Sequence, residues 1–242
     1  GIAMRLISSG DADVMITGGT EASITPLTIA GFANMRALSQ SNVNPEKASR
    51  PFDLNRNGFV LSEGSGMLVL ESETHAKNRK AEILAELAGY GASDDAFHIT
   101  QPAPGGMGAY KAMEKAIINA NLNKEQINYI NAHGTSTPFN DKNESQAIQN
   151  LFQEHSSKIK VSSTKSMTGH LLGAAGGIEA VTLVKAINEQ VLPPTINYDT
   201  PDPECTLDYV PNQAQDFNFE CGLSNTFGFG GHNAVICIKK YC

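Results

Sequence analysis

The 242-residue sequence predicts an α/β fold, in which helices cover the faces of a sheet. Two observations support this prediction. From residue 83 onward, short apolar runs typical of buried strands alternate with longer segments whose apolar residues recur at helical spacing. The composition is also that of an ordinary globular protein, with 40% hydrophobic residues, 22 glycines and 11 prolines.

The first 82 residues predict fewer elements and look like the end of a separate, similar unit. Residues 1–10 have helical spacing without an N-cap, so we expect the chain to begin inside a helix. Residues 12–17 are an apolar run typical of a buried strand. Residues 59–71 predict one strand with a bulge or two strands, and the polar residues 31–58 predict a long surface segment.

The remaining residues predict strands and helices in turn. An apolar stripe that begins at Ala109 and Ala112 predicts a helix over residues 109–120. The segment at 173–190 is apolar around much of its girth, so we expect a central helix there. The other predicted elements are strands at 83–90, 127–131, 159–162, 217–223 and 233–239, and a helix at 141–154.

Charge and cysteine content exclude several classes of protein. A net charge of −7 argues against binding to nucleic acid or to an anionic membrane surface. No apolar run approaches the roughly 18 residues of a membrane-spanning helix. The four cysteines, at positions 205, 221, 237 and 242, have no CxxC spacing, which argues against a zinc site or a disulfide scaffold. A reducing compartment fits best, either the cytoplasm or an organelle lumen.

Three stretches near the ends of predicted strands or helices hold the candidate functional residues. In the first, residues 131–138, His133 follows a strand beside Gly134 and two threonines, although such a histidine is more often structural. In the second, Lys165 and His170 flank the start of the apolar helix, whose N-terminus would keep an imidazole neutral. That stretch could also be a glycine-rich connection that packs closely.

The third stretch, residues 224–233, places Phe227 and Phe229 among three glycines. It could be a plain hairpin connection or a mobile loop with an aromatic gate.

Taken in order, HGTST, KSMTGH and SNTFGFGGHN resemble the β-ketoacyl-acyl carrier protein synthases of the elongating type I/II, and type II most closely. The resemblance continues in residues 11–19, 49–53, 58–64 and 192–197. Related families fit less well. Multidomain polyketide synthases resemble an HGTGT pattern from which Ser136 departs, and initiating synthases pair a histidine with an asparagine.

The resemblance implies a thiolase-like fold, which in the complete protein stacks two similar α/β halves into five layers. Residues 1–82 resemble the C-terminal part of the first half, and residues 83–242 resemble the whole second half. The family's nucleophilic cysteine lies shortly upstream of the position of Gly1. We therefore expect this chain alone to be inactive, because covalent catalysis needs that thiolate.

The resemblance also implies the reaction and the roles of individual residues. It is a decarboxylative Claisen condensation, in which malonyl-acyl carrier protein extends an acyl group held on the enzyme. His133 and His170 match the histidines that donate N–H bonds to the enolate oxygen. Lys165 matches the lysine that orients the site, with a structural salt bridge as the alternative. Thr135 and Thr137 resemble the hydroxyls that hold the pantetheine arm, and Phe227 resembles a gate with Phe229 behind it.

No cofactor is required by the family, but some members hold a structural monovalent or divalent cation. The alternative is an ordinary hydrogen-bond network around Glu179 and Lys165. The positions that match the cation ligands are Asn131, Glu144, Glu179, Ser224 and Asn225.

The partners implied by the resemblance are acyl carrier protein and, in the complete protein, a second copy in a homodimer. A non-catalytic chain-length-factor-like partner subunit is the main alternative, although such a subunit need not keep both histidines and the lysine. Another alternative is a half-domain that only binds acyl carrier protein. A basic patch of Arg36, Lys47, Arg50 and Arg56 would serve that binding.

Overall fold

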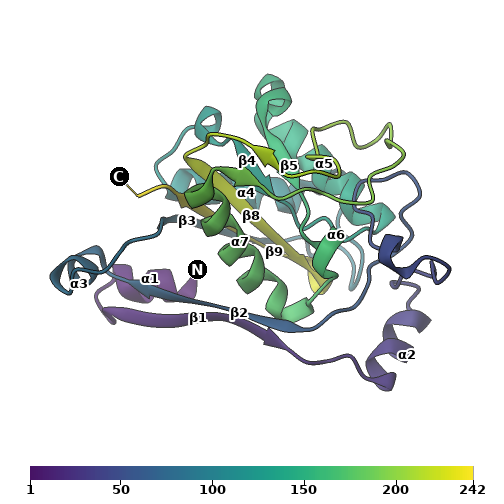
Figure 1. The fold of residues 1–242 in the computed structure, drawn as a ribbon, viewed down its shortest axis with the longest axis horizontal. Coiled ribbons are helices and arrows are strands. Elements are labelled where there is room, and N and C mark those ends of the chain that lie inside the picture. Colours follow the sequence, from purple (N-terminus) through teal and green to yellow (C-terminus); the bar gives the residue numbers. More distant parts are fainter. Residues whose placement is uncertain (242) are drawn as a thin grey trace.

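The computed structural model describes residues 1–241 and contains a five-stranded mixed sheet in the order β3-β9-β8-β4-β5 (Figure 1). Strands β4 and β5 run parallel to each other, and β4 also runs parallel to β8, whereas β8, β9 and β3 pair antiparallel. Their bounds are β3 Glu86–Asp94, β4 Tyr129–Asn131, β5 Lys160–Ser162, β8 Cys221–Gly228 and β9 His232–Lys239. The predicted α/β class is confirmed. Cys242 lies outside the described residues.

Helices cover both faces of this sheet. Helices α4 (Met107–Asn119) and α5 (Pro138–Phe152) bury one core against it, which includes Met113, Ile148 and Leu223. Helix α7 (Ala175–Glu189) packs on the other face through Leu183 and Ile187. The predicted helices at 109–120, 141–154 and 173–190 are therefore confirmed, with ends shifted by up to three residues.

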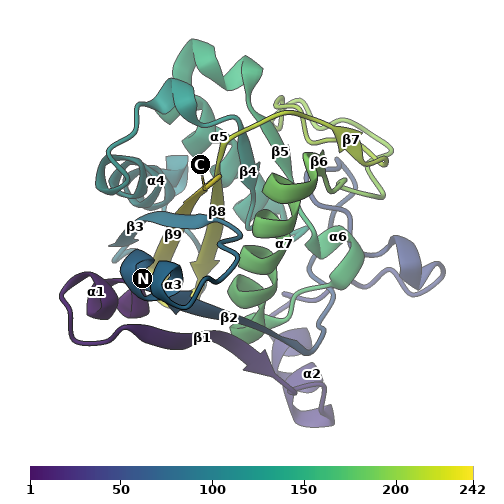
Figure 2. The same ribbon diagram turned by 60° about the vertical axis from the view of Figure 1, so that its left-hand side comes forward.

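Helix α7 is central because a second, two-stranded sheet covers its far side (Figure 2). Strands β1 (Val14–Glu21) and β2 (Gly64–Glu71) pair antiparallel and contact α7. Gly66 makes this contact possible, because a Cβ there would lie 2.3 Å from the backbone nitrogen of Ile178. The predicted central position of this helix is confirmed.

Shorter elements complete the chain. The remaining helices are α1 Ile2–Ser8, α2 Pro26–Asn34, α3 Glu73–Asn78 and α6 Lys165–Thr168. A two-residue pair joins β6 Val191–Leu192 to β7 Gln215–Asp216. The 3₁₀ turns are η1 Pro45–Lys47, η2 Pro104–Gly106, η3 Lys124–Gln126, η4 Gln153–Lys158, η5 Leu172–Ala174 and η6 Phe229–Gly231. Among the helices of residues 1–241, none is long and apolar enough to cross a membrane.

Two predictions about secondary structure are wrong. Strand β8 does not end at 223 but continues to Gly228, because residues 224–228 pair with β9 in an unbroken register. Residues 31–58 are not a surface segment throughout. Ser49, Phe52 and Asp53 are buried, because the polar groups of this stretch bond to each other and to distant loops.

Candidate active site

His133 and His170 meet at the carboxyl end of strand β4. Their ring centroids lie 5.3 Å apart with the ring planes at 85°. His133 follows β4 after one residue, and His170 follows α6 after Gly169. The backbone of His170 is held from the first 82 residues, since its N–H donates to the carbonyl of Val60 at 2.7 Å. The two predicted histidines therefore share one site.

Both imidazoles are neutral at physiological pH. Burial, together with the nearby charge of Lys165, lowers the pKa of His170 to about 3 and holds that of His133 well below its ordinary value. Nδ1 of His170 accepts the N–H of Leu172 at 3.1 Å, so its proton lies on Nε2. Burial and the charge of Lys165 are thus the causes of the lowered pKa values, and the contribution expected from the N-terminus of α7, which begins at Ala175, stays a prediction.

Lys165 and Glu179 form a buried ion pair beside the histidines. Lys165 is 1% exposed and Glu179 is 2% exposed. Burial raises the pKa of Glu179 to about 7 even though the charge of Lys165 opposes that rise. The pair places a fixed positive charge near two imidazoles, and this charge favours their neutral form.

A series of aromatic contacts extends from the two histidines. Phe227 lies with its ring centroid 5.6 Å from His133, and Phe59 packs edge-on against His170 at 5.2 Å. Phe32 contacts Phe59 at 5.3 Å and Phe229 at 6.2 Å. Phe227 therefore sits beside the histidines on strand β8, not in a loop, while Phe229 contacts Phe32 and is 46% exposed.

Sequence reasoning missed Phe32 and Phe59 as part of this site. Phe59 falls within the family-like stretch 58–64, which could have marked it, but it was assigned to a strand. No pattern in the sequence around Phe32 indicates its contact with Phe59.

The two predicted substrate-binding threonines form a hydroxyl pair. Oγ1 of Thr135 and Oγ1 of Thr137 lie 2.9 Å apart, at the start of helix α5. Just before them, the carboxylate of Glu144 accepts the backbone N–H groups of His133 and Gly134 at 2.9 and 2.8 Å. The helix that follows the loop thus fixes the backbone that carries His133.

The predicted cation ligands lie close together, since Asn131 and Ser224 are paired across strands β4 and β8. Nδ2 of Asn225 donates to Glu144 at 3.0 Å, and Nδ2 of Asn131 approaches the carbonyl of Glu179 at 3.5 Å. Three oxygens of this group are buried and have no hydrogen-bond partner among residues 1–241: Oδ1 of Asn131, Oδ1 of Asn225 and Oε2 of Glu179. Unpartnered amide and carboxylate oxygens fit a hard cation, and they fit an ordered water equally well. Ser224 is buried beside them on β8. Residues 1–241 contain no cluster of three or more His, Cys, Asp or Glu side chains suited to a metal.

Two other candidate groups take different places from those expected. Arg56 is buried, with ion pairs to Asp202 at 2.5 Å and Asp141 at 3.6 Å, and Arg50 pairs with Asp53 at 3.0 Å. The predicted basic patch therefore loses two of its four members, because ion pairs neutralise the buried guanidinium group of Arg56 and the half-buried one of Arg50. Arg36 and Lys47 remain exposed.

The thiols of Cys205 and Cys237 are buried, and burial raises their pKa to about 11 and about 12. Since the thiolate is the reactive form, neither is suited to act as a nucleophile.

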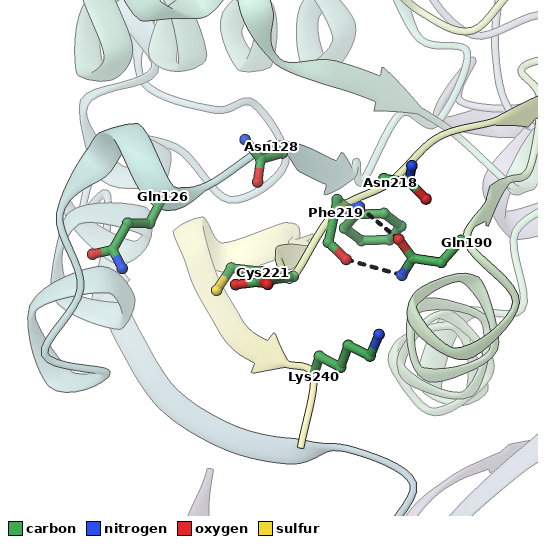
Figure 3. A pocket seen from close by; sticks show the side chains of 8 residues that line it. Gln126, Asn128, Gln190, Asn218, Phe219, Cys221 and Lys240 are labelled. Atoms are coloured by element: carbon green, nitrogen blue, oxygen red, sulfur yellow. Dashed lines mark hydrogen bonds between the residues drawn. The ribbon is translucent and has the colours of Figure 1, made fainter. Parts of the chain in front are cut away.

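A pocket of about 430 Å³, shown in Figure 3, lies at the start of strands β4 and β8, whereas the histidines lie at the carboxyl end of β4. Its lining includes Asn128, which precedes β4, and Phe219, which precedes β8. The side chain of Gln190 is already bonded to the backbone N–H and carbonyl of Phe219, at 2.8 and 2.9 Å. We therefore place the candidate site at the histidine pair, where neutral donors and an ion pair converge.

Comparison with known proteins identifies the family of the chain. The N-terminal domain of the beta-ketoacyl synthase family matches residues 1–76, and its C-terminal domain matches residues 84–199. Over 241 residues the chain is 56% identical to 3-oxoacyl-[acyl-carrier-protein] synthase 2 of Synechocystis sp. and 54% identical to that of Staphylococcus aureus. All of the chain is covered, and it spans 58% of the length of these two relatives.

Solved ketosynthase structures share the fold. A type II polyketide ketosynthase in complex with its acyl carrier protein superposes with a TM-score of 0.98 at 45% identity, covering 100% of this chain and 60% of that one. A beta-ketoacyl synthase from Burkholderia phymatum gives 0.95 at 38% identity, covering 100% and 58%. These likenesses confirm the predicted ketosynthase, or thiolase-like, fold. With both domain models matched in order along the sequence, the chain belongs to the β-ketoacyl synthase family.

Proposed function

We propose that the protein containing these residues is a 3-oxoacyl-[acyl-carrier-protein] synthase, an acyltransferase of fatty-acid elongation. The observation that carries the proposal is the pair of neutral imidazoles, His133 and His170, held 5.3 Å apart beside the fixed charge of Lys165. Two neutral N–H donors suit an oxygen that becomes negative during a reaction, because they stabilise the new charge without first giving up a proton.

The proposed reaction builds that negative charge on a thioester oxygen. In malonyl-acyl carrier protein, the bond between the α-carbon and the carboxylate breaks and carbon dioxide leaves. The electron pair of the broken bond stays on the substrate and forms an enolate. The enolate oxygen accepts hydrogen bonds from the N–H groups of His170 Nε2 and of His133. The enolate carbon then attacks the carbonyl of the enzyme-bound acyl thioester, and the enzyme thiolate leaves. One such donor typically contributes about 2.7–4 kcal/mol of transition-state stabilisation.

The acyl group needs a thiolate, and neither Cys205 nor Cys237 is in a setting that favours one. Cys205 and Cys237 are buried with raised pKa values, which disfavours their thiolate forms. We propose that the nucleophile is a cysteine upstream of Gly1, as the family resemblance implies. We expect the 242-residue chain alone to form no condensed product.

Partners and location follow from the same proposal. Acyl carrier protein would deliver both acyl and malonyl groups, and the ketosynthase that superposes at a TM-score of 0.98 is itself in complex with its acyl carrier protein. We also propose a homodimer for the complete protein, a cytoplasmic location, and a structural cation held by the unpartnered oxygens of Asn131, Glu179 and Asn225. A non-catalytic partner subunit is the weaker reading, since His133, Lys165 and His170 converge in one site.

The proposal is tested by separating decarboxylation from acyl transfer in the full-length enzyme. In His133→Ala and His170→Ala we expect malonyl decarboxylation to fall at least a hundredfold, because each loses a donor to the enolate. Transfer of the acyl group onto the enzyme should remain measurable, since no enolate forms in that step. His75→Ala, a histidine on helix α3, is the matched control. A variant of either site histidine that decarboxylates at the wild-type rate would contradict the assigned role.

A further inference from the structure

Residues 49–58 hold no side chain used in the proposed chemistry, yet they contact the loop that presents Thr135 and Thr137. The N–H of Arg50 donates to the hydroxyl of Ser136 at 3.0 Å. The N–H of Gly58 donates to the carbonyl of Ser136 at 3.0 Å. Both oxygens of Ser136 therefore accept hydrogen bonds from this distant segment. Ser136 lies between the two threonines in the sequence and is completely buried.

Arg56 holds the next two residues of the loop. Its Nε donates to the carbonyl of Thr137 at 3.3 Å, and its Nη2 donates to the carbonyl of Pro138 at 3.2 Å. The guanidinium group is itself fixed by the buried carboxylates of Asp202 and Asp141. A planar donor anchored on one side can fix two carbonyls on the other, which a lysine could not do in the same way.

The loop needs such support because its backbone is unusual. Ser136 has a φ of 68°, in the left-handed region that a serine adopts only when its surroundings impose it. In an extended chain the side chains of residues i and i+2 would be roughly 6.6 Å apart. The turn at Ser136 instead brings the Oγ1 atoms of Thr135 and Thr137 to 2.9 Å. The hydroxyl pair therefore depends on this turn.

We propose that residues 49–58 are a positioning element which, through Ser136 and Arg56, holds the Thr135–Thr137 turn in the form that receives the amide-bearing arm of the substrate thioester. The inference rests on the proposed function and deepens it. Ser136 and Arg56 do not touch the substrate. They set the direction of two hydroxyls that can each donate to, or accept from, an amide group.

The test compares two substrates in the full-length enzyme: malonyl-pantetheine, whose arm has amides, and the malonyl thioester of ethanethiol, which has none. The measured quantity is the ratio of their kcat/KM values for decarboxylation. In Ser136→Ala we expect this ratio to fall about fivefold through a higher KM for malonyl-pantetheine, the size of one neutral hydrogen bond. Arg56→Lys should lower the ratio in the same direction.

Ser136→Gly separates the hydroxyl anchor from the backbone strain, because glycine accepts a φ of 68° without cost. We expect it to lower the ratio as Ser136→Ala does. Ser145→Ala is the matched control, since it removes another buried hydroxyl, bonded to Tyr209 at 2.8 Å, and should leave the ratio unchanged. Adding Ser136→Ala to Thr137→Val should lower the ratio no further than Thr137→Val alone, because both act on one contact.

Two outcomes would overturn the inference. One is an equal loss on both substrates, which a purely structural role would produce. The other is a wild-type ratio in both Ser136 variants while Thr137→Val lowers it. Failure of the proposed function would look different, because the wild-type enzyme would then decarboxylate neither thioester.

Discussion

Replacing Lys165 by methionine would leave the carboxylate of Glu179 buried without its cation. The two side chains are 1% and 2% exposed, so bulk solvent does not screen the charge that is left behind. Removing one member of a buried ion pair typically costs about 3–5 kcal/mol of folding free energy. We expect that loss for Lys165→Met and for Glu179→Gln. The double variant, with neither charge, should lose at least about 2 kcal/mol less than the sum of the single losses.

The cost of Lys165→Met should also depend on pH. Burial already raises the pKa of Glu179 to about 7, and without Lys165 it would rise further. A carboxyl whose pKa is higher in the folded state binds its proton preferentially there. The free energy of unfolding of the variant therefore rises relative to that of the wild type as pH falls. The rise takes place between the folded-state pKa of Glu179 and its unfolded value near 4.5.

Urea unfolding of the four proteins at pH 8 and pH 5.5 provides the measurement. The control is Lys185→Met, which removes the same kind of side chain from an exposed pair with Glu189 on the same helix. That pair should contribute no more than about 0.5 kcal/mol. Additive losses in the Lys165–Glu179 cycle, or the same loss at both pH values, would refute the reasoning.

Three further predictions concern the gate, the histidines and the cation. Phe227→Ala should cost less than the ~3–5 kcal/mol of a fully buried phenylalanine, because Phe227 is only half-buried, while acyl transfer slows. A large stability loss with normal transfer kinetics would show a packing role instead. Decarboxylation should show no midpoint from imidazole protonation between pH 5 and 8, since the pKa of His170 is about 3 and that of His133 is also lowered. An NMR titration of either ring with a midpoint near pH 6 would contradict this. After treatment with a chelator and dialysis, adding K⁺ or Mg²⁺ should raise the melting temperature of the wild type but not of Asn225→Leu. Equal responses would assign the unpartnered oxygens to water.

The helices could be predicted from the sequence because their signal is local. The stripe from Ala109 to Ile117 lies within three turns of chain, and the structure buries those residues in α4. The predicted strand ends at residue 223, because residues 224–228 include an asparagine and a glycine, which are typical of loops. Only their pairing with β9 makes them a strand, and that pairing is not visible in the residues themselves.

The candidate site shows the same division. His133, Lys165 and His170 could be selected because each lies in a motif. That these three residues lie close together could not be derived from their spacing in the sequence. It depends on the positions of β4 and α6 and on the isolated β-bridge between Leu61 and His170. The buried position of Arg56 was missed for a similar reason. Its partners Asp141 and Asp202 lie 85 and 146 residues further along the chain, and a lone arginine in a polar stretch resembles a surface residue.

Residues before position 83 thus supply no predicted catalytic side chain, yet they determine the geometry of those that follow. Ser49 donates to the carbonyl of Lys165 at 2.6 Å, Val60 holds the backbone of His170, and Phe59 packs on its ring. Each is a short-range contact across a large sequence separation, and the first two are hydrogen bonds that would be costly to leave unmade. A buried polar network of this kind specifies one arrangement of the loops, because any displacement of a loop leaves a buried donor or acceptor without a hydrogen-bond partner. This explains how neutral imidazoles can be held in fixed directions on loops rather than within helices or strands.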